Sequence, residues 1–261
     1  DRTTIENEIH GVSCIATEET PELLAHSLIA FEAEIHNIHP KPAYDKVQQE
    51  LLLSNNNSSS ISTTSYIHTN TFRLRFLRCE LFHVRKAAER YLKYLDFVWE
   101  VYGDYALQRH IKMSDLTRDE MAFLREGLYQ ILPYRDQSGR RIIFKKRKEV
   151  SLQTLLRLEF YLLNACVGGC DTSNNDFNNI ECHRKGVIIV AYFPGKINLQ
   201  RTHISAEGMI AQIVPIRVVC IHLCLPSKQV YRVTGKLIGM ALSALNSRTK
   251  IHLGNPVECH H

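Results

Sequence analysis

Val187-Ile-Ile-Val-Ala-Tyr192 and Val218-Val-Cys-Ile221 are the two runs that decide the fold class of this chain. Both are short, rich in β-branched residues and almost free of polar ones, which is typical of strands covered on both faces. Residues 141–145 form a third segment of this kind. Because helical stretches separate the strands, the pattern predicts an α/β fold with a mixed, mostly parallel sheet flanked by helices.

The residues that precede these strands carry helical patterns instead. Residues 22–53 look helical, with a break at His39-Pro40-Lys41-Pro42, where two prolines disfavour a continuous helix. Residues 84–102 repeat apolar side chains at three- and four-residue spacing and predict an amphipathic helix. Thr117-Arg-Asp-Glu120 is a capping-box pattern that predicts the start of another helix, and a further one follows Ser151.

Residues 54–65 are almost entirely Ser, Asn and Thr, and we expect a flexible insert there because small polar side chains bury too little surface to offset chain entropy. The sequence thus divides into an acidic N-terminal arm (1–21), a helical N-terminal subdomain (22–104) and an α/β domain (105–261).

Composition excludes several classes of protein. The 261 residues are 44% hydrophobic and 23% charged, with a net charge of +5, which rules out a wholly disordered or collagen-like chain. No run approaches the roughly 18 apolar residues of a spanning helix, so we expect a soluble protein. Eight widely spaced cysteines predict reduced thiols in a cytosolic setting. The chain lacks an initiator Met and a secretory pattern, and we expect a piece of a longer protein.

Charge is distributed unevenly along the chain. Residues 1–50 hold 10 acidic and 3 basic residues, residues 51–150 hold 11 and 18, and residues 151–261 hold 6 and 11. This asymmetry suits a basic face that meets phosphates on a membrane, a lipid headgroup or a nucleic acid. An ordinary solvated surface with an acidic arm is the alternative.

Motifs for catalysis and for metal binding are lacking. The sequence holds no G-x-S-x-G, H-E-x-x-H, G-x-x-x-x-G-K-[ST] or G-x-G-x-x-G, and we expect a protein that is not an enzyme and needs no cofactor. Cys166, Cys170, Cys182 and His183 are too poorly spaced to favour a zinc site, so we also expect no metal.

Two features point to an apolar ligand. Cys220, His222 and Cys224 alternate along a predicted strand and therefore share one face, which would line a pocket or, alternatively, pack in the core. Residues 228–245 carry a wide apolar face with Lys228, Arg232 and Lys236 four residues apart. Such a helix could lie at a membrane surface, or it could be a plain crossover between strands.

Three stretches within residues 71–254 belong together. The first is Leu74-Arg75-Phe76-Leu77-Arg78, followed by Phe82 and Lys86-Ala87, and the second is Asp136-Gln-Ser-Gly139-Arg140-Arg141-Ile142. The third is the order of elements: a strand ending at Gly195, Pro215-Ile216-Arg217, the apolar helix and Lys250-Ile-His-Leu-Gly254. Together they resemble the CRAL-TRIO lipid-binding family, in which the first stretch is similar to the N-terminal helical signature and the second to a turn into a strand.

The resemblance implies a non-enzymatic domain in which residues 228–245 form a gate over a lipid cavity and Lys250 meets a headgroup. Ile216 replaces the Glu that helps to hold inositol in the phosphatidylinositol-transfer branch, which leaves neutral or aromatic lipids such as sterols, tocopherols and retinoids open. The resemblance also implies that the domain is C-terminally truncated, because the closing segment of the family is missing after residue 254.

We therefore expect binding or transfer of a hydrophobic lipid by a monomer that is cytoplasmic and peripherally membrane-associated. The alternative is a protein-interaction or scaffold module that keeps the fold without a ligand. Nucleic-acid binding is disfavoured because no aromatic platform alternates with the bases. The expected lipid-lining residues are Phe144, Ile188, Val190, Tyr192, Cys220, His222, Cys224, Val233, Leu237 and Met240, and the expected headgroup or membrane contacts are Arg217, Lys228, Arg232 and Lys250.

Overall fold

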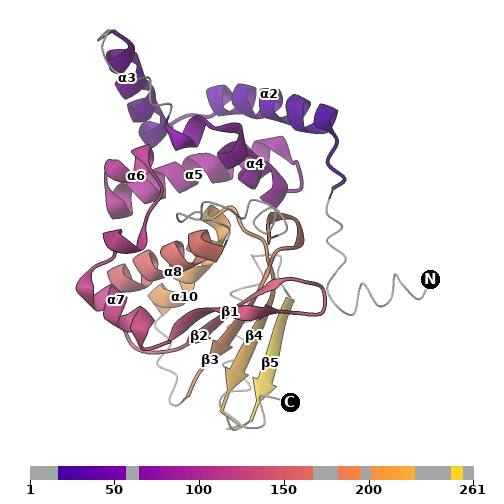
Figure 1. Ribbon diagram of the computed structural model, residues 1–261, viewed down its shortest axis with the longest axis vertical. Coiled ribbons are helices and arrows are strands. Elements are labelled where there is room, and N and C mark those ends of the chain that lie inside the picture. The colour runs from indigo at the N-terminus through magenta and orange to yellow at the C-terminus, as the bar shows by residue number, and fades with distance from the viewer. Residues whose placement is uncertain (1–16, 57–64, 167–181, 195–200, 227–247, 255–261) are drawn as a thin grey trace, which may run out of the picture.

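The computed structural model describes residues 17–56, 65–166, 182–194, 201–226 and 248–254, and their centre is a five-stranded sheet (Figure 1). Its strands lie side by side in chain order, β1-β2-β3-β4-β5. β1 pairs with β2 antiparallel, and every later pair is parallel. The predicted α/β class, with a mixed and mostly parallel sheet, is thus confirmed. The bounds are β1 Tyr129–Arg135, β2 Arg141–Lys146, β3 Val187–Tyr192, β4 Val218–Leu225 and β5 Arg248–Leu253.

Helices fill most of the described residues before the sheet and also lie in the connections from β2 to β3 and from β3 to β4. The predicted break between the first two helices is confirmed, and the His39–Pro40 peptide bond there is cis. The second helix extends through residues 54–56, which begin the expected insert, and residues 57–64 lie outside the described part of the chain. The bounds are α2 Pro21–Asn37, α3 Pro42–Asn56, η1 Tyr66–His68, α4 Asn70–Cys79, α5 Val84–Tyr102, α6 Tyr105–Gln108, η2 Met113–Asp115, α7 Arg118–Arg125, α8 Leu152–Cys166 and α10 Arg201–Ile213.

The elements form layers, with the N-terminal helices on one side, the sheet on the other, and α8 and α10 between them (Figure 1). One continuous apolar core runs through all of these layers, from Phe31 of α2 and Tyr91 of α5 to Leu158 of α8 and Ile221 of β4. Since burying apolar surface is the main favourable term in folding, the helical part and the sheet stabilise each other.

Local sequence explains why the central helices form where they do. The apolar stripe of α5 is buried as its periodicity predicts, and the helix ends at Gly103, whose φ of 91° few other residues adopt readily. At the start of α7, the Thr117 hydroxyl accepts a hydrogen bond from the Glu120 N–H while the Glu120 carboxylate accepts one from the Thr117 N–H. The predicted capping box is therefore confirmed.

The end of α4 is closed by a Schellman motif without a glycine. The Phe82 N–H donates to the Leu77 carbonyl at 2.7 Å, and the Leu81 N–H donates to the Arg78 carbonyl at 3.2 Å. Leu81 takes the left-handed position of the motif with φ 51°, and Phe82 follows at φ 62°. Glycine is the usual residue at that position because a Cβ atom strains it.

Buried ion pairs fix the sheet against the two helices of the middle layer. Lys145 of β2 pairs with Glu159 of α8, and both side chains are almost fully buried. Arg147, which follows β2, pairs with Glu207 of α10. Because an uncompensated charge is costly in a dry environment, these pairs fix which face of β2 meets the helices.

Candidate functional site

The two faces of the sheet differ in what they contact. Ile143, Ile189 and Ile221, on adjacent strands, belong to the core that includes α8 and α10, and Lys145 reaches α8 from the same side of β2. Successive side chains of a strand point to opposite faces. Residues one position away from these therefore lie on the other face, which we call the distal face.

Seven described residues expected to line a lipid site lie together on the distal face. Paired residues of neighbouring parallel strands share a face, so the strand register groups them into rows. With their neighbours, the rows are Ile142–Ile188–Cys220, Phe144–Val190–His222–Lys250 and Lys146–Tyr192–Cys224–His252. Cys220, His222 and Cys224 occupy alternate positions of β4 and share one face, as expected.

The distal face is mostly apolar but incompletely buried. Ile188, Cys220 and Cys224 are less than a tenth exposed, yet none of them belongs to the main core. Phe144, Val190, Tyr192 and His222 are partly exposed. Apolar side chains that pack outside the core and retain contact with solvent are suited to contact a ligand or another surface.

A polar group borders this apolar area on β4 and β5. The rings of His222 and His252 stack with their centroids 5.1 Å apart, and His222 Nδ1 lies 2.9 Å from His252 Nε2. Burial lowers the pKa of His222, and the neighbouring His252 and Lys250 lower it further. Lys250 itself is exposed beside His222. The distal face thus combines an apolar area with a basic edge.

The expected headgroup residues do not all come together. Arg217 immediately precedes β4, and at about 3.3 Å per residue it lies roughly 17 Å along the strand from the His222–Lys250 row. Lys250 and Arg217 therefore belong to different places on the molecule. Val233, Leu237, Met240, Lys228 and Arg232, together with the expected gate at 228–245, lie outside the described residues.

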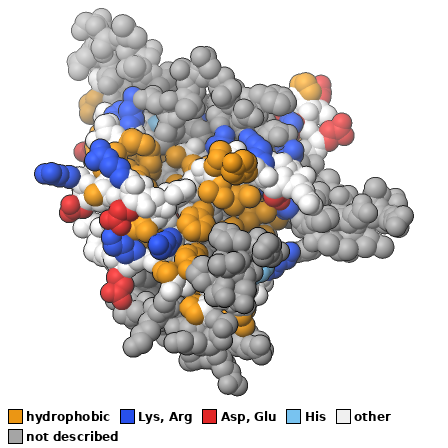
Figure 2. Space-filling model, turned by 60° about the horizontal axis from the view of Figure 1, so that its bottom comes forward, with side chains coloured by type: hydrophobic (Ala, Val, Ile, Leu, Met, Phe, Trp, Pro, Cys, Tyr) orange, Lys and Arg blue, Asp and Glu red, His pale blue; other side chains and the backbone are white. Residues whose placement is uncertain are grey.

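The space-filling view in Figure 2 brings forward the side on which the sheet lies in Figure 1. Hydrophobic side chains gather near the middle of this view, and Lys and Arg side chains lie beside them. This side of the molecule therefore exposes apolar and basic groups close to one another.

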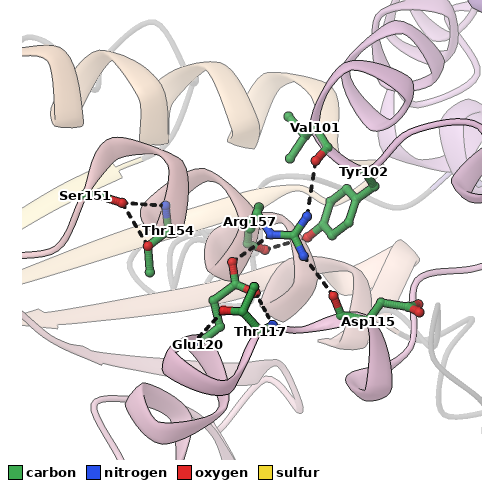
Figure 3. Close-up of polar contacts among 8 residues, drawn as sticks. All are labelled: Val101, Tyr102, Asp115, Thr117, Glu120, Ser151, Thr154 and Arg157. Atoms are coloured by element: carbon green, nitrogen blue, oxygen red, sulfur yellow. Dashed lines mark hydrogen bonds and ion pairs between the residues drawn. The ribbon is translucent and has the colours of Figure 1, made fainter.

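A second polar cluster, around Arg157 of α8, is structural (Figure 3). Its guanidinium donates to the Glu120 carboxylate at 2.7 Å and to the Val101 and Asp115 carbonyls at 3.2 and 2.8 Å. The Tyr102 hydroxyl donates to the Arg157 carbonyl at 2.8 Å. Each of the three guanidinium nitrogens has a protein acceptor, so this cluster joins α5, η2, α7 and α8 and is complete without a ligand.

The described residues show neither a metal-binding cluster nor a membrane-spanning helix. They contain no group of three His, Cys, Asp or Glu side chains arranged to hold a metal ion. Cys166 and Cys182 are buried, whereas Cys170 lies outside the described part. None of the described helices combines the length and the apolar character needed to cross a bilayer.

Comparison with known proteins gives no assignment: no protein-family model matches the chain, and no curated protein matches it significantly.

Sequence reasoning missed two features near the expected site. His252 alternates with Lys250 along β5, and that two-residue spacing could have placed it on the same face. Arg217 lies in a small pocket with Glu19, Arg78 and Arg184. No local signal predicts this grouping, because the four residues come from distant parts of the sequence.

Proposed function

We propose that the chain is a non-enzymatic lipid-binding or lipid-transfer protein that holds the apolar part of its ligand against the distal face. The observation that carries this proposal is the set of rows across β2, β3 and β4, in which apolar side chains lie outside the main core. The resemblance of the sequence to the CRAL-TRIO family supports the same function.

The chemistry of the distal face favours an amphiphile. Phe144, Ile188, Val190 and Tyr192 offer apolar and aromatic contacts, and each methylene removed from water contributes about 0.8 kcal/mol. Lys250 and the His222–His252 pair stand at one side of this area and can contact a polar or anionic group. A ligand with one long apolar part and one polar end fits such a surface.

Lipid recovery from the purified protein tests the proposal. The protein is mixed with phosphatidylcholine vesicles that contain dehydroergosterol as a fluorescent sterol, separated from them and extracted for mass spectrometry. We expect at least one lipid species to co-purify or to load from the vesicles. Protein that carries no lipid and takes up none would contradict lipid binding and favour a protein-interaction role for the same fold.

A pair of matched variants assigns the binding to the distal face. Val190→Asp places a carboxylate among the apolar rows, whereas Ile29→Asp places one on α2, where Ile29 is 73% exposed. Burying a charge against a lipid tail is costly, so Val190→Asp should reduce lipid recovery at least about tenfold. Ile29→Asp should leave it unchanged. Circular dichroism and thermal melts check that both variants fold.

A further inference from the structure

Two arginines from separate elements bind one buried carboxylate, and a third arginine lines the same pocket. Arg78 lies in the last turn of α4, Arg184 precedes β3, Arg217 precedes β4, and Glu19 lies just before α2. Arg78 donates to both oxygens of Glu19, from Nε at 3.0 Å and from Nη2 at 2.9 Å. Arg184 donates a third hydrogen bond, from Nε to Oε1 at 3.0 Å.

Glu19 is held tightly in this arginine cluster. Its side chain is only 4% exposed and that of Arg78 only 9%. Burial raises the pKa of Glu19, but the hydrogen bonds and charges of Arg78 and Arg184 outweigh that effect and lower the pKa to about 2. Glu19 is therefore ionised at neutral pH and behaves as an anion bound by its own protein.

The Glu19 carboxylate does not supply an acceptor for every hydrogen-bond donor of the arginine cluster. Arg217 Nη2 donates to the Arg184 carbonyl, but Arg217 Nε and Nη1 are buried and have no hydrogen-bond partner among the described residues. Among the described residues that line this pocket are three arginines and one carboxylate, that of Glu19. Unpaired buried donors are costly, so the cluster has the capacity to bind a further oxyanion oxygen.

The pocket is small while Glu19 occupies it. It is open to solvent and is lined by Thr17, Glu19, Arg78, Leu81, Phe82, Arg184 and Arg217. A phosphate group offers more oxygens than a carboxylate, in a tetrahedral arrangement that several guanidinium groups can contact at once. To reach all three arginines it would have to displace the Glu19 carboxylate.

We propose that the arginine cluster is a binding site for a phosphate-type anion and that Glu19 occupies it as an intramolecular competitor. The acidic segment before α2 thereby weakens anion binding until a phosphate displaces its carboxylate. The anion is either a free phosphate compound or a phospholipid headgroup. The arginine cluster is separate from the distal-face rows, so binding of a free phosphate compound does not depend on the proposed lipid function. Binding of a phospholipid headgroup rests on that function.

Calorimetry with inorganic phosphate tests the free-anion version on lipid-free protein. Glu19→Gln keeps the shape of the side chain but removes its charge, and should bind phosphate about tenfold more tightly than the wild type. Arg217→Gln in the Glu19→Gln background should remove that gain. Arg85→Gln, on the exposed surface of α5, is the control and should change nothing.

Sedimentation with phosphatidylcholine vesicles, with and without phosphatidic acid, tests the headgroup version. Greater binding of Glu19→Gln than of wild type to the phosphatidic acid vesicles alone supports the lipid source, and tighter phosphate binding supports the free-anion source. The proposal is overturned if Glu19→Gln strengthens neither, or if Arg217→Gln leaves the gain intact.

If Glu19→Gln is less stable than the wild type, thermal melts with and without phosphate still test the proposal. Phosphate should raise the melting temperature of Glu19→Gln more than that of the wild type, because it binds the folded variant more tightly. Dehydroergosterol loading, measured on the same variants, separates the two proposals. Glu19→Gln should load as much dehydroergosterol as the wild type. If the sterol loads normally but no anion binds, only the anion site is refuted.

Discussion

His222 of β4 and His252 of β5 are stacked with only 8° between their ring planes and are joined through Nδ1 and Nε2 at 2.9 Å. One of these two nitrogens must donate and the other must accept. The accepting ring is therefore neutral for as long as the bond persists, and the pair cannot carry two positive charges without breaking it.

This pairing predicts that the protein loses stability as the solution becomes acidic. Burial, followed by His252 and Lys250, lowers the pKa of His222 below its ordinary value of 6.5. Below pH 6.5 the unfolded chain therefore binds this proton more readily than the folded chain does, and the free energy of unfolding falls. Urea denaturation between pH 7.5 and pH 5 should show that fall.

The variant His222→Gln isolates this contribution. Gln can still hydrogen-bond but does not titrate in this range, so the loss of stability on acidification should be smaller than in the wild type. His68, whose pKa is also lowered, by burial and then by Arg73, retains its own share in both proteins. Equal pH dependence of the two proteins would contradict the prediction.

Arg157→Leu should destabilise the protein by about 3 kcal/mol, because it leaves the buried Glu120 carboxylate without its partner. The Val101 and Asp115 carbonyls also lose their donor. Chemical denaturation measures the change, and a double-mutant cycle with Glu120→Gln measures the coupling between the two side chains.

Lys148→Ala is the matched control for Arg157→Leu. Lys148 pairs with Glu126 directly after α7, but both side chains are about half exposed. Exposed ion pairs contribute little, so this change should cost less than about 1 kcal/mol. A loss for Arg157→Leu no larger than that for Lys148→Ala would show that the Arg157 cluster is not a structural junction.

Leu81→Gly should yield a more stable protein than Leu81→Ala, by about 1 kcal/mol. Both changes remove the same partly exposed side chain, but only Gly relieves the strain of φ 51°. Thermal melts of the two variants provide the comparison. An Ala variant as stable as the Gly variant would mean that the left-handed position is unstrained.

Cys79 and Cys166 should resist alkylation in the folded protein. Burial raises the pKa of Cys79 to about 11 and that of Cys166 to about 12. At pH 8 the Cys79 thiolate is present on the order of once in a thousand molecules, and it is shielded from reagents. Treatment with iodoacetamide followed by peptide mass spectrometry should label both residues only in denaturant. Labelling of either in the native protein would contradict their burial.

The parts of the fold that the sequence predicts are those specified by local patterns. The spacing of apolar residues defines α5, the Thr117–Glu120 capping box defines the start of α7, and the continuous apolar runs define β3 and β4. Each signal depends on neighbours within a few residues, so no knowledge of the tertiary structure is needed to interpret it.

β1 is the strand that sequence analysis misses. It contains Pro133, which cannot donate a hydrogen bond to a neighbouring strand, and its pairing with β2 is irregular between Ile131 and Arg135. Proline is tolerated there because β1 lies at the edge of the sheet. β1 therefore has no regular alternation of apolar and polar residues by which the sequence could reveal it.

The two candidate sites also differ in whether local sequence patterns predict them. Alternation along β4 is enough to place Cys220, His222 and Cys224 on one face before the structure is known. The pairing of Glu19 with Arg78 spans 59 residues, and its pairing with Arg184 spans 165. Such contacts follow from the packing of whole elements, so neither composition nor spacing could predict them.

The order of the strands has a consequence for how this protein is made. Each described strand after β1 is hydrogen-bonded to the described strand that precedes it in the chain. During synthesis on the ribosome, each newly emerged strand can therefore pair with one that has already been translated. The five described strands can therefore assemble one after another in the direction of translation.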